Sequence, residues 1–288
     1  MGCCQVLVDE WRLGMWSTID VNGKTIDVVS TFRPRPPLLT GIIKLGFLVW
    51  SIHLLVVSLV EQPDPKAFWL AYLTHWGLML TIFYQLLSFS RMILPIAQEP
   101  VDFLTRLGWG VFTTVANVEV IITILYWTLE YKGGSVSYLN IMKHGILLLE
   151  VWFDGFVLNR IPIRMKQVLW VYLLAVTFLI WTGIHSASGI GNPYNSDNDP
   201  ATDDDAIYRS VNWKERPVTG IIMGIAVLFV LIPILIITTY FLSTLLGRRY
   251  IENPDSDNPR TDANDDAEDP RTQAQEYVAD PKTEAISY

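Results

Sequence analysis

The sequence contains four histidines, and one of them, His75, directly follows Thr74 inside an apolar stretch. Polar side chains are costly in such surroundings unless they have hydrogen-bond partners. A threonine hydroxyl can attack an acyl carbon when an imidazole takes its proton, and imidazoles can also bind zinc, copper or iron. The remaining histidines, His53, His144 and His185, each stand alone in further apolar stretches.

Six apolar runs dominate the chain, and each is about as long as the 20 residues that a helix needs to cross a membrane, or longer. They cover residues 38–60, 67–89, 107–129, 138–159, 167–188 and 218–246. None alternates with a period of two, as the strands of a membrane barrel do. The sequence therefore predicts an all-α integral membrane protein in which residues 38–249 form a bundle of six transmembrane helices.

The net charge of −8 comes entirely from residues 250–288, which hold eleven acidic and three basic side chains. This segment is rich in Pro, Asp, Asn and Thr and has few large apolar residues, so we expect a disordered cytoplasmic tail. The rest of the chain is balanced in charge. The composition therefore gives no electrostatic reason to expect a nucleic-acid partner.

Basic residues in short loops favour the cytoplasm. Eleven such residues lie near helix ends on the amino-terminal side of the predicted bundle, and five lie on the opposite side. We therefore expect both termini in the cytoplasm and residues 189–217 outside. The length of the apolar runs suits the thicker plasma membrane.

The chain begins with Met-Gly-Cys-Cys. Gly2 is a candidate for myristoylation, and Cys3 and Cys4 are candidates for palmitoylation on the cytoplasmic side. Residues 1–37 are therefore predicted to form a cytoplasmic segment that acyl chains attach to the membrane. Since these are the only cysteines, a disulfide cannot brace the outer loops.

Residue counts place the polar groups at similar depths, because a helix rises about 1.5 Å per residue. In helices that enter from the outer face at residues 67 and 138, Thr74 lies about 10 Å deep and His144 about 9 Å deep. His53 and His185 fall in the same outer layer. Thr74 and His75 point about 100° apart around a helix. We therefore expect His75, like His53 and His185, to be a neighbouring group or an alternative metal ligand.

Three interpretations of this layer stay open: a catalytic Thr–His pair, a metal site, or ordinary hydrogen bonds between packed helices. No histidine spacing matches a metal-ligand motif, so we expect neither a metal nor another cofactor. Glu119 and Glu150 have no evident partner in their predicted helices. Asp154 shares a helix face with Glu150, and we expect Arg160 or Arg164 to pair with it. An ion path through these acids is a more distant alternative, since no internal repeat of the transporter kind is present.

Three segments carry a resemblance to a known family: "YLTHWGLMLTIFYQLLS", "HGILLLEVWFDGFVLNRIPIR" and "IYRSVNWKERP". Together they resemble the rolling stone-like proteins over roughly residues 40–246. The resemblance implies a multi-pass plasma-membrane protein with a part in cell–cell fusion or other membrane-surface processes. More distantly, the chain is similar to the androgen-induced membrane hydrolases, which cleave fatty-acid esters of hydroxy fatty acids. That similarity implies a lipid ester substrate, with Thr74 as the nucleophile and His144 as its partner.

Overall fold

The computed structural model describes residues 3–33, 36–62, 66–96, 100–131, 133–192 and 206–251. Within these ranges the chain is helical and has no strand, only two isolated bridges that join Ile19 to Thr25 and Ile26 to Tyr250. Gly2 and most of the predicted tail, from Glu252 onward, lie outside the described residues.

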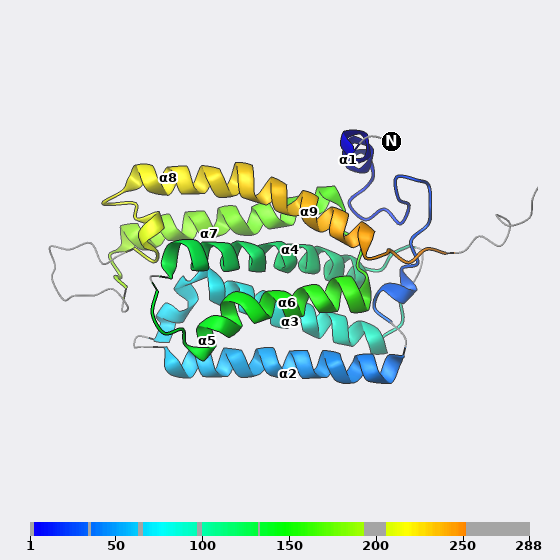
Figure 1. Cartoon of the computed structure of the whole chain (residues 1–288), viewed down its shortest axis with the longest axis horizontal. Coiled ribbons are helices and arrows are strands. Elements are labelled where there is room, and N and C mark those ends of the chain that lie inside the picture. The colour runs from blue at the N-terminus through cyan, green and yellow to red at the C-terminus, as the bar shows by residue number, and fades with distance from the viewer. Residues whose placement is uncertain are drawn as a thin grey trace, which may run out of the picture. The chain divides into compact units, whose positions relative to one another are not determined.

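Helical stretches from the six apolar runs pack side by side along one axis (Figure 1). The first is α2 (Pro37–Glu61), and the second is the 3₁₀ segment η2 (Lys66–Ala71) with α3 (Leu73–Ile93). The third is α4 (Phe103–Leu125) with the π-helical η3 (Tyr126–Glu130). The fourth is made of α5 (Tyr138–Ile141), η4 (Met142–Ile146), α6 (Leu147–Trp152) and η5 (Phe153–Asn159). The fifth is η6 (Met165–Gln167) with α7 (Val168–Ser188), and the sixth is α8 (Pro217–Ala226), η8 (Val227–Leu231) and α9 (Ile232–Leu245).

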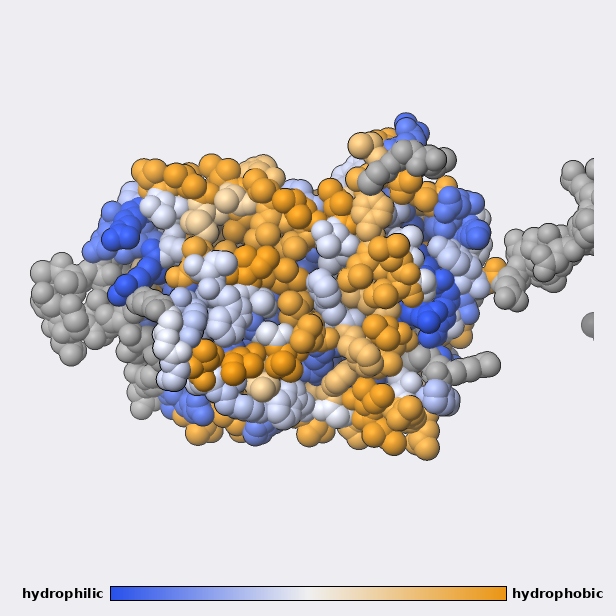
Figure 2. Space-filling view, in the orientation of Figure 1, coloured by the Kyte–Doolittle hydropathy of each residue, from blue (hydrophilic) through white to orange (hydrophobic). Residues whose placement is uncertain are grey.

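Four of these stretches are long and apolar enough to cross a membrane: Pro37–Glu61, Phe103–Glu130, Met165–Ser188 and Pro217–Leu245. Large apolar side chains remain exposed along α2 and along α8, η8 and α9, including Ile42, Val49, Ile222, Phe229 and Ile234. Figure 2 shows hydrophobic side chains over much of one face and hydrophilic ones gathered toward its two ends. Contiguous exposed apolar surface of this kind indicates a membrane protein.

Helix α4 is the centre of the bundle, because most of its apolar length is buried and it contacts α3, α6, α7 and α9. Its Trp109 and Phe112 are fully buried. A Cβ at Gly155 would lie only 1.8 Å from the Phe112 ring. The missing side chain at Gly155 therefore lets η5 pack directly against α4.

Two helices depart from the regular course that the apolar runs predict. α3 begins at Leu73 rather than at residue 67, because Tyr72 has an extended backbone (φ −91°, ψ 135°). The Tyr208 hydroxyl accepts a hydrogen bond from the Leu73 N–H at 3.1 Å, which satisfies one of the unpaired donors at the new helix start. In the fourth stretch, His144 has a non-helical backbone (φ −114°, ψ 18°) inside η4. π-helical insertions of this kind are frequent at functional sites.

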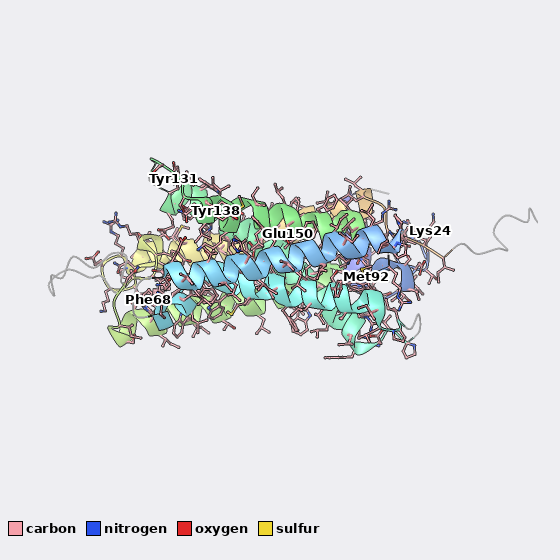
Figure 3. All side chains as sticks on the ribbon, turned by 90° about the horizontal axis from the view of Figure 1, so that it is seen from below. Lys24, Phe68, Met92, Tyr131, Tyr138 and Glu150 are labelled. Atoms are coloured by element: carbon pink, nitrogen blue, oxygen red, sulfur yellow. The ribbon has the colours of Figure 1, made fainter. Side chains whose placement is uncertain are left out.

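The two ends of the bundle differ in what covers them. Figure 3 shows Lys24 and Met92 at one end, and Phe68, Tyr131 and Tyr138 at the other. We call the first the terminal end, because residues 3–33 and residues 247–251 meet there through the bridge between Ile26 and Tyr250. The other is the distal end, and it holds the loop of residues 206–216.

The segment before α2 is folded onto the terminal end. It begins with α1 (Cys3–Arg12), where Glu10 accepts two hydrogen bonds of 3.1 Å from Arg164. Arg164 also donates to the backbone carbonyls of Ser17 and Ile19. Both charged side chains are almost wholly buried, so this ion pair attaches residues 3–33 to the loop between η5 and η6.

Candidate functional site

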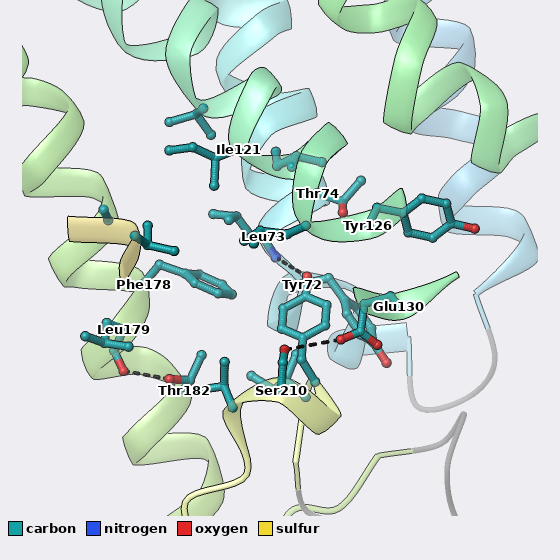
Figure 4. A pocket seen from close by; sticks show the side chains of 18 of the residues that line it. Tyr72, Leu73, Thr74, Ile121, Tyr126, Glu130, Phe178, Leu179, Thr182 and Ser210 are labelled. Carbon is teal, nitrogen blue, oxygen red and sulfur yellow. Dashed lines mark hydrogen bonds between the residues drawn. The ribbon is translucent and has the colours of Figure 1, made fainter. Parts of the chain in front are cut away.

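A cavity of about 540 Å³ lies near the distal end, within the range of about 300–1,000 Å³ that is common for ligand sites (Figure 4). One part of its wall is apolar and comes from α4, α7, α8 and η8, with Val118, Ile121, Leu125, Leu174, Phe178, Met223 and Leu228. The other part is polar and includes Tyr72, Thr74, His75, Glu130, Asn140, Lys143, His144, Asn192, Tyr208 and Ser210. A cavity of this composition suits an amphiphile.

Thr74 is the second residue of α3, and its side chain is buried in the cavity wall. Both its backbone and its side chain interact with the Tyr208 hydroxyl. The apolar run predicts a continuous helix from residue 67 through Thr74. Instead, Thr74 lies at the amino terminus of its helix, where the partial positive charge of the helix dipole favours a negative charge nearby.

His144 lines the same cavity from η4. Its ring stacks flat on Tyr126, with 3.6 Å between the ring centres and 2° between the ring planes. The indole of Trp127 donates to the His144 carbonyl at 2.7 Å. The Nδ1 atom is buried and has no hydrogen-bond partner within the described part of the chain. Buried polar atoms in native proteins usually have a hydrogen-bond partner, so this atom needs an explanation. One explanation is that His144 Nδ1 exchanges a proton with a substrate.

The structure therefore brings Thr74 and His144 to one cavity, although no direct hydrogen bond joins these two described side chains. Catalytic hydrogen bonds are often long in a protein without substrate. The predicted pairing of the two stays a prediction.

The other histidines are dispersed. His75 also lines the cavity, but it stacks on Trp69 at 4.1 Å, and its Nδ1 lies 2.5 Å from the Trp69 carbonyl. His53 is exposed on α2. His185 is buried in α7 against Phe68. Among the described residues, no three histidine, cysteine or acidic side chains gather to hold a metal ion.

Two functional candidates were not found from the sequence. Lys143 lines the cavity, and its ammonium lies 3.5 Å from His75 Nε2. A lysine directly before His144 within an apolar run was the available signal. Tyr208 lies in a polar loop more than a hundred residues from Thr74, so nothing local in the sequence connects the two.

A second polar cluster lies inside the bundle, on the terminal side of the cavity. The prediction that Arg160 or Arg164 pairs with Asp154 is wrong, because Lys44 of α2 lies 3.3 Å from Asp154 Oδ1 and Arg164 pairs with Glu10. Arg160 ends η5 with a left-handed backbone (φ 55°), where the chain turns away from Asp154.

The two remaining acids also have partners. Gln85 donates to Glu150 at 2.6 Å, and Thr81 donates to Glu119 at 3.3 Å. Both donors lie on α3, so the polar side chains of this helix face inward. The carboxylates that had no evident partner in the sequence are thus part of the packing between α3 and its neighbours.

The acylation candidates lie at the terminal end. Cys4 is exposed and free in the first turn of α1. Cys3 begins the same helix, and Gly2 precedes the described residues. Acylation at these positions stays a prediction.

No protein-family model, curated protein or solved structure matches the chain.

Proposed function

We propose that the protein is an intramembrane hydrolase of lipid esters, in which Thr74 is the nucleophile and His144 its base. The observation that carries this proposal is that both side chains line one cavity whose remaining wall is largely apolar. An acyl chain fits along α4, α7 and η8, and its ester group then lies at the polar part of the wall. Fatty-acid esters of hydroxy fatty acids are the substrates that the sequence resemblance implies.

The chemistry needs only these two side chains and water. His144 takes the hydroxyl proton of Thr74 while the threonine oxygen bonds to the acyl carbon and the carbonyl electrons move onto their oxygen. The carbonyl then re-forms, the ester bond breaks, and the departing alcohol takes the proton from His144. Water releases the acid from Thr74 by the same sequence of steps.

We propose that all six helical stretches span the membrane. The mean hydropathy of four of them is high enough for a membrane span. In the other two, polar residues such as Thr81 and Glu150 face inward and lower the mean hydropathy. Their outward faces carry exposed apolar side chains, including Phe83 and Leu149. Both stretches pack along α4, so a membrane that surrounds the four surrounds these as well.

The cellular setting of the proposal is the plasma membrane, with both termini in the cytoplasm and the distal end outside. A rolling stone-like protein with a part in cell–cell fusion would act there. Lipid hydrolysis in the outer half of the bilayer is a membrane-surface process of the kind that this resemblance implies.

The test is covalent labelling of the full-length protein in detergent by an alkyl fluorophosphonate, which reacts with activated hydroxyls. We expect labelling of the wild type and none of Thr74→Ala. Ser210→Ala is the matched control, because the Ser210 hydroxyl lies in the same cavity and donates to Glu130 at 3.3 Å. An unreactive wild type, or equal labelling of Thr74→Ala, would show that the proposal is wrong.

A further inference from the structure

Tyr208 connects the distal loop to the start of α3. Its hydroxyl accepts from the Leu73 N–H at 3.1 Å and lies against Thr74. Figure 4 marks the hydrogen bond from Leu73 and shows Thr74 beside it in the cavity wall. The Tyr208 ring is held by edge contacts with Tyr72, at 5.9 Å between ring centres, and by Phe178. The position of this hydroxyl is therefore set by packing on two sides.

The hydroxyl proton of Tyr208 remains available. In the described part of the chain its hydrogen bond with the Leu73 N–H uses a lone pair of the oxygen, and no acceptor is bonded to the proton. Burial raises the pKa of Tyr208, so the phenol stays protonated at neutral pH. A phenol that accepts one hydrogen bond becomes a stronger donor in the next, since such bonds polarise one another.

We infer that Tyr208 is a catalytic residue that donates a hydrogen bond to the oxyanion formed when Thr74 attacks a lipid ester. When the Thr74 oxygen bonds to the acyl carbon, the former carbonyl oxygen lies one bond away from that carbon and gains the negative charge. A donor already in contact with Thr74 is within reach of it. The Leu73 N–H, at the positive end of α3, then acts on the oxyanion through the Tyr208 hydroxyl.

This inference rests on the proposed hydrolase function and adds the group that stabilises its transition state. No proton is transferred from Tyr208: it donates a hydrogen bond that strengthens as charge develops and weakens as the carbonyl re-forms. The leaving alcohol still receives its proton from His144. Removing one such donor typically lowers the rate by about 10²–10³ fold.

The experiment compares the alkyl fluorophosphonate labelling rate of the full-length wild type with those of Tyr208→Phe and Trp213→Phe. Trp213 is the control, since its indole N–H donates to Thr182 at 3.0 Å and ties the same distal loop to α7, while its side chain does not line the cavity. We expect Tyr208→Phe to react about 10²–10³ fold more slowly. Trp213→Phe should react at close to the wild-type rate. Binding of a non-hydrolysable ether lipid should be unchanged in Tyr208→Phe, because an ether develops no oxyanion.

The outcomes separate the two proposals. A wild type that does not react overturns the hydrolase function itself. If labelling of the wild type requires Thr74, and Tyr208→Phe is labelled as fast as the wild type, only the role of Tyr208 is overturned. An equal loss in Trp213→Phe and Tyr208→Phe shows that these side chains merely fix the loop, which also overturns the role of Tyr208.

A second measurement applies where Tyr208→Phe does not fold. A fluorinated tyrosine inserted at position 208 alone keeps the hydroxyl but lowers its pKa. The labelling rate should then decline at a lower pH than in the wild type, because a deprotonated phenol cannot donate. An unchanged pH profile would contradict the inference.

Discussion

Lys44 is a charged residue within the apolar run of residues 38–60, and its surroundings explain how it is tolerated there. Its ammonium donates to Asn159 Oδ1 at 2.6 Å and to the Ser88 hydroxyl, and it lies 3.3 Å from Asp154 Oδ1. Asp154 also accepts from Tyr84 at 2.6 Å. Removing two charges from water is costly, and a buried pair is tolerated only when further hydrogen bonds satisfy both partners. Here α3 and η5 supply them.

We expect Lys44→Met to destabilise the protein strongly, because Asp154 then remains buried without a cation. The loss of one partner of a buried pair costs about 3–5 kcal/mol. The double variant Lys44→Met, Asp154→Asn should recover much of this stability, since no charge is left unpaired. The measurement is the unfolding midpoint of the purified protein in detergent.

The control for this prediction is Arg209→Met, because Arg209 is an exposed cation in the distal loop. Its effect should lie within about 0.5 kcal/mol. If Lys44→Met has the same unfolding midpoint as Arg209→Met, the buried pair does not stabilise the bundle.

The same residues show how far a single sequence leads. The apolar run predicts that Asp154 is buried and needs a cation, and the nearest cations along the chain are Arg160 and Arg164. The true partner lies on another helix more than a hundred residues away, and the left-handed turn at Arg160 directs the nearer cation elsewhere. Helix periodicity predicts which residues share a face, but not which faces meet.

At the scale of elements, the bundle and the segment before it are joined by a few buried polar contacts. Residues 3–33 depend on the ion pair between Glu10 and Arg164 and on the bridge between Ile26 and Tyr250. Arg249 also donates to the Ser30 carbonyl. Residues 3–33 are therefore folded onto the terminal end of the bundle by these contacts.

We expect Glu10→Gln to loosen this segment without unfolding the bundle, because Arg164 loses its only close carboxylate among the described residues. Hydrogen exchange of the amides in residues 17–31 should become faster, while that of α4 stays unchanged. Asp9→Asn is the matched control on the same helix, where the pair with Arg12 is largely solvent-exposed and such pairs contribute about 0–1 kcal/mol. Equal exchange in both variants would show that the buried pair does not hold the segment.

Helix α1 also decides whether its cysteines are accessible to an acyltransferase. Cys4 is exposed, and Val8 and Trp11 are half-exposed on the same helix, which suits contact with the membrane surface. Palmitate incorporation should disappear in the Cys3→Ser, Cys4→Ser double variant, while insertion of the bundle survives. Retained incorporation would contradict acylation of these thiols, since the chain has no other cysteine.

The apolar runs predict where the long helices lie, but they do not predict where these helices start late or lose their helical backbone. Four runs match the long apolar helices within a few residues, because hydrophobic length is a property of the local sequence. The late start of α3 depends on Tyr208 from another loop, and the non-helical backbone at His144 depends on packing between helices. The cavity could therefore be predicted only as a layer of polar residues. Its wall and Tyr208 follow from the tertiary structure.

At the scale of the whole molecule, the two ends are chemically different. The polar wall of the cavity lies near the distal end, whereas the terminal end carries the folded amino-terminal segment and most of the basic residues. Those described at the terminal end are Arg12, Lys24, Arg33, Arg91, Arg106, Arg160, Arg164, Lys166, Arg248 and Arg249. Those described at the distal end are Lys66, Lys143, Arg209, Lys214 and Arg216. A substrate would therefore reach Thr74 from the side of the membrane opposite to the basic end.

This asymmetry predicts the orientation, because short loops rich in Lys and Arg stay in the cytoplasm. An epitope tag inserted at residue 200 should stain intact cells, and a tag after Tyr288 should stain only permeabilised cells. The structure adds a further expectation: residues 3–33 and 247–251 meet at one end, so a tag before Met1 must behave like the carboxyl-terminal one. Opposite behaviour of the two terminal tags would require an odd number of spans and would contradict the six-helix bundle. If both terminal tags stain intact cells, the bundle stands but is inverted, and the cavity with Thr74 faces the cytoplasmic half of the membrane.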